Sequence, residues 1–394
     1  MKTSVASASA GGTVTNVAHR LIVQLDRGLE GRPPALVLVF ASASQPIRDI
    51  LTELSKNYAD AAVLGTSTAG EFTEGGDAKN STTAVAIAGD FEVFTGFGAG
   101  LKSDPTAAIS AAIKDFPAHR DGYAHRTAIL LLDPLSGKGE EATLIAASML
   151  GEEVQLVGGA AGDDLSMKQT HVGLGPRVQS DAVAMAMIFS KSPWGVGVRH
   201  GHQPISDPLK ITKATDNVVY EIDGRPAWEV WAEKTKTAAA AANLDPNSLS
   251  DAEVGPYLLR YEAGLPTGGE LLKIRAPLAR GDDGSLSFAC GMVEGAEVRI
   301  TESVPQRQIE SARLAARTAV EKLGAQPAAG AIVFDCICRN LILNDQFKDA
   351  LHAIHEEIGK TPLAGFETYG EIALNVGDMS GFHNTTTVVL AVPQ

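Results

Sequence analysis

The sequence predicts an α/β fold made of two related modules, each built from repeated strand–helix–strand units with mixed sheets. Short apolar runs typical of buried strands alternate with stretches whose apolar residues recur at helical spacing. This order occurs three times, and each time a glycine-rich loop follows the second strand. At 394 residues the chain exceeds the size at which one hydrophobic core usually stops growing, so we expect two domains.

The first copy of the unit occupies residues 35–88. Its helix places Ile47, Ile50, Leu51 and Leu54 on one face, at spacings of three and four residues. The predicted strands are 35–40, 61–64 and 82–88, and the loop is 65–71.

The second and third copies repeat this order. The second has strands 127–132, 154–157 and 181–189, a helix near 139–150 and the loop 158–164. The third has strands 331–334, 363–364 and 385–391, a helix with Phe347, Leu351, Ile354 and Ile358 on one face, and the loop 365–371. A strand, a helix and a second strand imply a parallel crossover. Each loop should therefore follow the carboxyl end of a strand, where open α/β sheets hold ligands.

Segments outside these copies complete the predicted organisation. Residues 94–100 and 289–295 each precede a helix that leads into the first strand of a copy, so we interpret them as equivalent. The segment 225–260, with a helix around 228–242, is expected to connect the domains. Residues 1–12 are small and polar, and we expect a frayed tail there.

Composition limits the classes of partner. The net charge of −14 and the lack of a dense basic run argue against nucleic acid and anionic membrane surfaces. No apolar stretch reaches the roughly 18 residues needed to span a bilayer. Three cysteines are too few for a disulfide framework, so a cytoplasmic location is expected.

The three glycine-rich loops are the strongest candidates for a binding site. Glycines can turn backbone N–H groups outward to form an anion-binding nest, and the threonines add hydroxyl donors and acceptors. The alternative is that each glycine only makes a tight turn. Glu71, Asp163 and Glu371 directly follow loop glycines. They could act as acid and base, but no nucleophile accompanies them, so structural or ligand-orienting roles are favoured.

Cysteines, one arginine and the histidines raise further alternatives. Cys336 could become a reactive thiolate beside Arg339, or it could pack as a small apolar residue, which we favour. Arg339 could bind an anionic ligand group bidentately. An isolated histidine in a pocket could be an axial haem ligand. The standard nucleotide-binding signatures are absent, which counts against an ATPase or a dehydrogenase.

Several of these segments together resemble the FIST family. The resemblance rests on segments 65–71, 159–163, 198–204, 221–227, 336–339 and 365–371, followed by His383 and Asn384. It extends from about residue 35 to residue 392, with the parts at 221–227 and 365–371 the most specific. It implies a tail and first helix over 1–34, a FIST N-terminal module over 35–224 and a FIST C-terminal module over 225–394.

The resemblance also implies a function. FIST proteins are regarded as small-ligand-binding input modules of bacterial signal transduction, with amino acids as proposed ligands. We expect that this chain is not an enzyme. Some members bind haem, sense nitric oxide and regulate a histidine kinase. The chain shows no kinase, cyclase or methyl-accepting segment, so we expect it to act in trans on a partner such as a histidine kinase.

The sequence therefore predicts a sensor whose ligand is an amino acid or, alternatively, haem with nitric oxide. An enzyme using a cysteine or a carboxylate is a third possibility. If haem is the cofactor, His200 is the first candidate for its ligand and His383 the second. The residues expected to bind the ligand are Gly65, Thr66, Thr68, Gly70, Glu71, Gly159, Gly162, Asp163, Cys336, Arg339, Thr368, Gly370, Glu371, His383 and Asn384.

Overall fold

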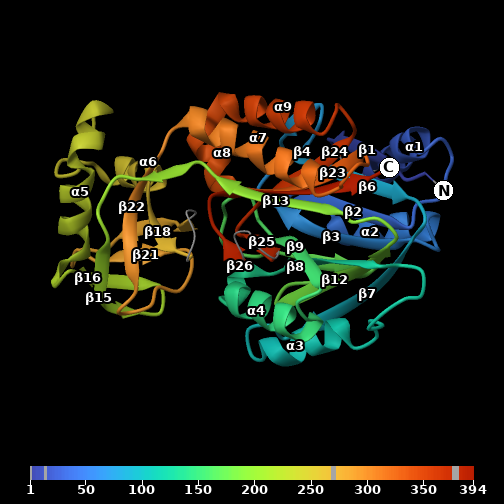
Figure 1. Cartoon of the computed structure of the whole chain (residues 1–394), viewed down its shortest axis with the longest axis horizontal. Helices are drawn as coiled ribbons and strands as arrows, with labels where there is room; N and C mark the ends of the chain where they lie inside the picture. Colours follow the sequence, from blue (N-terminus) through green and yellow to red (C-terminus); the bar gives the residue numbers. More distant parts are fainter. Residues whose placement is uncertain (1, 13–15, 268–271, 375–380) are drawn as a thin grey trace.

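The chain forms a large body of three sheets and a smaller body beside it (Figure 1). The computed structural model describes residues 2–12, 16–267, 272–374 and 381–394. Strands pair both in parallel and in antiparallel fashion, and helices cover the outside of the sheets, so the predicted α/β class with mixed sheets is confirmed. Within the described part of the chain, every helix is too short or too polar to traverse a bilayer.

The first sheet contains the first predicted copy of the unit. Across the sheet its strands are β1 (Ser4–Gly11), β6 (Ser81–Ala88), β2 (Leu36–Ser42), β3 (Ala62–Thr68), β10 (Val172–Leu174) and β11 (Arg177–Gln179). β2 and β3 are parallel, joined by α2 (Ile47–Asn57), whose predicted apolar face is buried. α1 (Val17–Gly28) covers the same side of the sheet.

The second sheet contains the second copy. Its strands are β26 (Gly381–His383), β25 (Glu371–Leu374), β9 (Val154–Ala160), β8 (His125–Leu132), β12 (Ala182–Ser190) and β7 (Phe91–Ala99). Its helices are α3 (Pro105–Ile113), α4 (Gly139–Leu150) and the short η2 (Pro134–Ser136). As predicted, β8 and β9 are parallel, and α4 connects them.

The third sheet contains the third copy. Its strands are β13 (Gly195–His200), β27 (Thr386–Pro393), β23 (Ala328–Cys336), β24 (Leu363–Thr368), β4 (Glu71–Thr73) and β5 (Gly76–Ala78). Its helices are α7 (Pro305–Glu321), α8 (Ile337–Leu343), η3 (Asn344–Gln346) and α9 (Phe347–Glu357). All four residues of the stripe predicted for the last helix are buried.

A cyclic exchange of hairpins joins the three units. The hairpin β10–β11 of the second unit pairs with β3 of the first, and the hairpin β25–β26 of the third pairs with β9 of the second. The hairpin β4–β5 of the first unit pairs with β24 of the third, which closes the ring. The threefold repeat is thus confirmed. The exchange was not predicted, because nothing in the spacing says which unit a hairpin joins.

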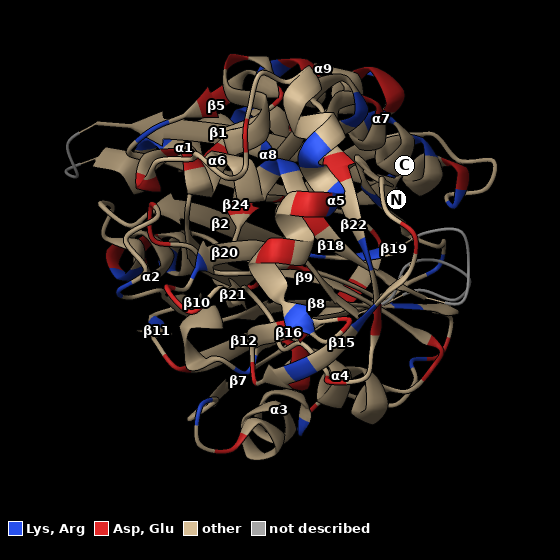
Figure 2. Ribbon diagram, turned by 90° about the vertical axis from the view of Figure 1, so that its left-hand side faces the viewer, with Lys and Arg blue, Asp and Glu red and all other residues tan. Residues whose placement is uncertain are grey.

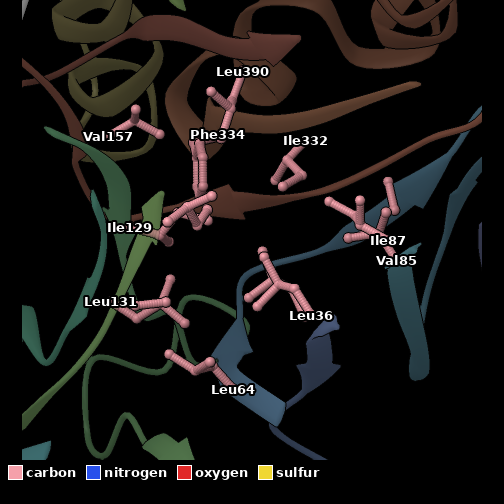
Figure 3. Packing of buried hydrophobic residues seen from close by; sticks show 14 of the residues in the cluster. Leu36, Leu64, Val85, Ile87, Ile129, Leu131, Val157, Ile332, Phe334 and Leu390 are labelled. Carbon is pink, nitrogen blue, oxygen red and sulfur yellow. The ribbon is translucent and has the colours of Figure 1, made fainter. Parts of the chain in front are cut away.

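The main hydrophobic core lies where the three sheets face one another. Figure 3 shows residues of all three units converging there, including Leu36, Leu131 and Phe334. Phe40 and Phe366, from different units, stack with ring centroids 4.8 Å apart. Each sheet buries one face in this core and the other under helices, which explains why the central strands are continuous apolar runs.

The smaller body is inserted between β13 and α7. Its strands are β14 (His202–Pro204), β15 (Leu209–Thr215), β16 (Val218–Ile222), β17 (Arg225–Pro226), β18 (Tyr261–Pro266), β19 (Leu272–Arg275), β20 (Pro277–Arg280), β21 (Leu286–Phe288) and β22 (Glu297–Ser303). It also contains α5 (Ala227–Ala241) and α6 (Asp251–Arg260), which pack on those strands. The helix predicted at 228–242 exists. The expectation that 225–260 is a connection is wrong, because Trp231 and Tyr257 lie in this body's own core.

Two other expectations are corrected. The supposed frayed tail contains β1, paired with β6 along its full length, since its alternate small side chains fit under α1. The counterpart of 94–100 is β13, and not residues 289–295, which lie in the smaller body. A Cβ added to Gly96 would lie 1.7 Å from the Ala112 carbonyl oxygen, and one on Gly197 would lie 1.9 Å from that of Ala315. Both strands therefore use glycine to let a helix approach.

Candidate functional site

The three glycine-rich loops converge at the centre of the large body. Gly162 N donates to Ser67 O over 2.9 Å, which joins the second loop to the first. Glu367 N donates to Gly70 O over 2.7 Å, and Ala160 N donates to Gly370 O over 2.8 Å. The loops thus form a closed ring of backbone hydrogen bonds, one loop from each unit.

The loop glycines serve this contact and do not form the expected anion-binding nest. A Cβ on Gly162 would lie 2.4 Å from Ala69 N, and one on Gly159 would lie 2.7 Å from Thr368 Cγ2. A Cβ on Gly65 would lie 2.8 Å from Val39 O, and one on Gly370 would lie 2.1 Å from Phe382 Cζ. Because several loop N–H groups bond to neighbouring loops, close approach of backbones explains the glycines.

Glu71 and Glu371 have equivalent structural positions. Glu71 accepts hydrogen bonds from Thr68 Oγ1 at 2.7 Å and from Ser81 N at 2.9 Å. Glu371 accepts from Thr368 Oγ1 and from Thr386 N, the latter at 3.2 Å. Each carboxyl therefore ties its loop to the start of the unit's last strand. Burial raises the pKa of Glu71 to about 7 and that of Glu371 well above its usual value.

Asp163 and Thr66 also hold the loops together. Asp163 accepts backbone N–H donors from residues 167–169 at 2.6–2.9 Å and the Tyr369 hydroxyl at 2.7 Å. Although burial opposes it, these hydrogen bonds lower the pKa of Asp163. Thr66 Oγ1 donates to the His171 carbonyl oxygen over 3.1 Å. These side chains are therefore occupied by the protein itself.

Arg339 does not face a ligand, so the expected anion-binding role is corrected. Its side chain is fully buried, and Nε donates to Asp335 Oδ1 over 2.5 Å. Nη1 bonds to Gln308 and to Ser311, and Nη2 donates to Gln308 O over 3.0 Å. Asp335 lies at the end of β23 and Arg339 in the first turn of α8, so the strand-to-helix turn brings the two side chains into a fully buried ion pair.

Cys336 has the environment of a packed thiol. Its side chain is 2% exposed, and burial raises the pKa of the thiol well above its usual value, opposite to what a nucleophilic thiolate requires. The interpretation of Cys336 as an apolar packing residue agrees with this environment. It nevertheless borders a cavity, described below.

The residues expected to hold haem do not fit that group. Burial lowers the pKa of His200 to about 4 and that of His383 to about 3, so both rings are neutral. His200 Nδ1 accepts the His202 N–H over 3.2 Å. An axial ligand must face a slot for the porphyrin, yet neither ring borders either cavity described below. Beside His383, Asn384 Oδ1 accepts the Ala276 N–H, which links the two bodies.

An apolar cavity of about 230 Å³ lies at the junction of the two bodies. Leu165, Cys336 and Tyr369 come from the large body, while Leu259 and Leu278 come from the smaller one. The full lining is Leu165, Met167, Gly255, Leu259, Ala276, Pro277, Leu278, Ala289, Cys336, Ile337, Cys338, Leu341, Tyr369 and Asn384. Of the predicted site residues, Cys336 and Asn384 are brought here.

A polar cavity of about 320 Å³ adjoins the apolar one. Leu165, Ile337 and Leu341 line both cavities. The full lining is Ala69, Gly70, Glu71, Asp77, Ala78, Lys79, Asn80, Asp164, Leu165, Ile337, Asn340, Leu341 and Glu367. Of the predicted site residues, Gly70 and Glu71 are brought here. The other predicted residues line neither of the two cavities.

Sequence reasoning missed the residues that line most of the two cavities. Glu367 lies inside the quoted loop 365–371, and its position between Phe366 and Thr368 on a buried strand was a usable signal. Leu278 and Leu259 belong to the inserted body, and no local pattern indicates that they face the loops.

Comparison with known proteins identifies two domain models along the chain. Residues 35–225 match the FIST N domain, and residues 227–374 match the FIST C domain. The chain is also similar to the uncharacterized protein MJ1623 of Methanocaldococcus jannaschii, with 23% identity over 258 residues. That match covers 60% of this chain and 48% of the relative, so the chain spans about half the length of the relative it matches.

Proposed function

Because this chain belongs to the FIST family, whose domains are associated with sensory signal transduction and small-ligand binding, we propose that it is a ligand sensor using the junction cavities. One observation carries the proposal. The apolar cavity takes its walls from both bodies, so a molecule bound there touches both at once. Pockets between domains are common sites for small ligands.

Ligand binding would act on the placement of the two bodies. They are joined by hydrogen bonds such as Thr385 Oγ1 to Glu262 Oε1 at 2.8 Å and Arg275 Nη1 to Phe382 O at 3.0 Å. A ligand favours whichever arrangement it binds more tightly. The smaller body protrudes from the large one (Figure 1), so a shift at the junction would alter the surface offered to a partner.

We propose that the partner is a signalling protein such as a histidine kinase, in the cytoplasm, as the family resemblance implies. Figure 2 views the molecule from the side of the smaller body, where Lys and Arg are interspersed with Asp and Glu. A mixed surface of this kind suits protein contacts better than a nucleic-acid backbone. We also propose that the role is non-enzymatic, since Glu71, Glu371 and Cys336 are engaged in tying loops or buried as a packed thiol.

The test is a thermal-unfolding screen of the purified protein against amino acids, amines, carboxylates and neutral metabolites. A ligand at a hundred times its Kd adds about 2.7 kcal/mol to the free energy of unfolding. Leu278→Glu at the cavity should abolish the gain, whereas Leu314→Glu, on an exposed leucine of α7, should preserve it. Absence of any stabilising compound would contradict the proposal. A Soret band after addition of haemin that is lost in His200→Ala would favour the haem alternative.

A further inference from the structure

The polar cavity carries an excess of negative side chains. Its lining contains the carboxyl groups of Glu71, Asp77, Asp164 and Glu367 but a single cationic group, that of Lys79. In a site partly shielded from water, such an excess attracts cations and disfavours anions. The charge balance alone therefore disagrees with a ligand that presents only a carboxylate.

Glu367 is a buried carboxyl group of this cavity, and only one of its two oxygens accepts a hydrogen bond from the described residues. Its side chain is 3% exposed, and Oε1 accepts a hydrogen bond from Asn340 Nδ2. Among the residues that the structure describes, no group donates to Oε2. The carboxyl lies directly against Gly70, where an added Cβ would come within 2.6 Å of Oε2. Because Glu367 lines the cavity and Oε2 takes no donor from the described residues, this oxygen can accept a hydrogen bond from a ligand.

The raised pKa of Glu367 is consistent with a site for a cation beside this carboxyl group. Burial and, to a smaller extent, the neighbouring carboxyls of Asp335, Asp77 and Glu71 together raise the pKa of Glu367 to about 8, although the hydrogen bond from Asn340 lowers it. An ammonium group nearby would favour the ionised form of Glu367 and lower that pKa.

The apolar cavity adjoins the polar one, and the two share some of their lining residues. Leu165 and Leu341 border both cavities and are 49% and 39% exposed. Met167 and Leu278 extend the apolar mouth, with exposures of 56% and 49%. Exposed apolar side chains that form a contiguous patch often mark a binding site. A ligand long enough to occupy both cavities would cover these exposed apolar side chains.

We propose that the junction binds an organic cation with an apolar body, its ammonium group beside Glu367 and its apolar part against Leu165, Leu278 and Leu341. This inference rests on the proposed function and names the chemical class of its ligand. The guanidinium of Arg339 is fully buried and bonded to Asp335, Gln308 and Ser311, and Arg339 does not line the polar cavity, so it does not offset the acidic lining.

Calorimetric titration of the full chain with three matched probes tests the ligand class. 2-Phenylethylammonium should bind at least tenfold more tightly than neutral 2-phenylethanol, and the anion 3-phenylpropionate should bind weakest. Glu367→Gln keeps an acceptor for Asn340 and should cost the cation at least tenfold in affinity while leaving the alcohol unchanged. Glu321→Gln, on the exposed end of α7, is the matched control and should change neither.

Measuring the affinity for a cation over a range of pH separates pairing with Glu367 from general electrostatic attraction to the cavity. The probe is trimethyl(2-phenylethyl)ammonium, whose charge does not titrate. Because protonated Glu367 must lose its proton before it pairs with the cation, affinity should fall by up to tenfold per pH unit below about pH 8. Glu367→Gln should flatten that dependence. If that variant does not fold, Asp77→Asn at the exposed rim and Leu278→Ser should each weaken cation binding.

The outcomes distinguish this inference from the function on which it rests. If the alcohol or the carboxylate binds more tightly than the cation, and this binding is lost in Leu278→Glu, the proposed cation class is wrong. The junction would still be a ligand site. Equal binding of all three probes by wild type and Glu367→Gln would also overturn it. If no compound binds, including those of the wider screen, the proposed function itself fails.

Discussion

At the scale of single residues, the buried charges of the large body are neutralised within the chain. Arg339 and Asp335 are both fully buried, and Gln308, Ser311 and Thr387 form further hydrogen bonds with them. Such a network stabilises little compared with an apolar core, but removal of one member leaves an uncompensated charge. The pair thus fixes α8 against β23 and α7, directly behind the wall of the apolar cavity.

We predict that Arg339→Met lowers the free energy of unfolding by about 3–5 kcal/mol, since Asp335 keeps its burial and loses its counter-charge. Urea unfolding followed by circular dichroism measures the change. Arg317→Met removes an exposed partner of Glu357 and should have little effect. Equal losses in the two variants would show that burial of the pair is not what matters.

At the scale of elements, strand and helix approach each other closely at the start of the second and third units. Gly96 and Gly98 on β7 face carbonyl oxygens of α3, and Gly195 and Gly197 on β13 face those of α7. In the first unit the same place is filled by Gly28 of α1 against Ala6 of β1. In the first unit the glycine is on the helix and not on the strand. The sequence therefore showed no sign that β1 is equivalent to β7 and β13.

We predict that Gly96→Ala costs about 3 kcal/mol or more, because its Cβ would overlap the Ala112 carbonyl oxygen and force β7 away from α3. Gly255→Ala in α6 meets no atom within 4 Å and should raise stability by about 0.5–1 kcal/mol. Thermal unfolding of both variants tests the contrast. A mild effect at Gly96 would mean that the helix can shift at little cost.

At the scale of the whole molecule, the family modules and the two bodies divide the chain differently. The second and third sheets combine strands from both matched segments, whereas the smaller body spans β14 to β22. We therefore keep the division into 35–224 and 225–394 as a proposal about modules of sequence. Folding units should follow the ring and its insertion, since the ring closes only when all three hairpins are present.

We predict that replacing residues 203–302 with a short Gly-Ser loop leaves the ring folded and abolishes ligand stabilisation. The cut ends lie side by side, because His202 pairs directly with Ser303. A fragment of residues 1–225 should instead fail to unfold cooperatively, since β9 loses β25 and the shared core loses the third unit. Circular dichroism and hydrogen exchange would decide. A stable fragment would contradict the ring as the unit of folding.

The local pattern of apolar residues was sufficient to predict much of the fold. Apolar runs and helical stripes identified the central strands of all three units and the helices between them, because burial on one or two faces leaves a periodic trace. The glycine-rich loops were correctly grouped. Parallel crossovers place each loop at a strand end of its own unit, and the exchange of hairpins brings the three loops together.

Only the tertiary structure decided which residues of the loops line a cavity. Thr68, Asp163 and Arg339 look like binding residues in sequence, yet each satisfies a partner within the protein. Glu367 lies in the predicted loop 365–371 and was not among the predicted binding residues, yet it lines a cavity and its Oε2 takes no donor from the described residues. The physical reason is that a polar side chain's role depends on whether its partners come from distant segments. Hairpin exchange and the insertion bring in those segments without leaving a periodic signal in the chain.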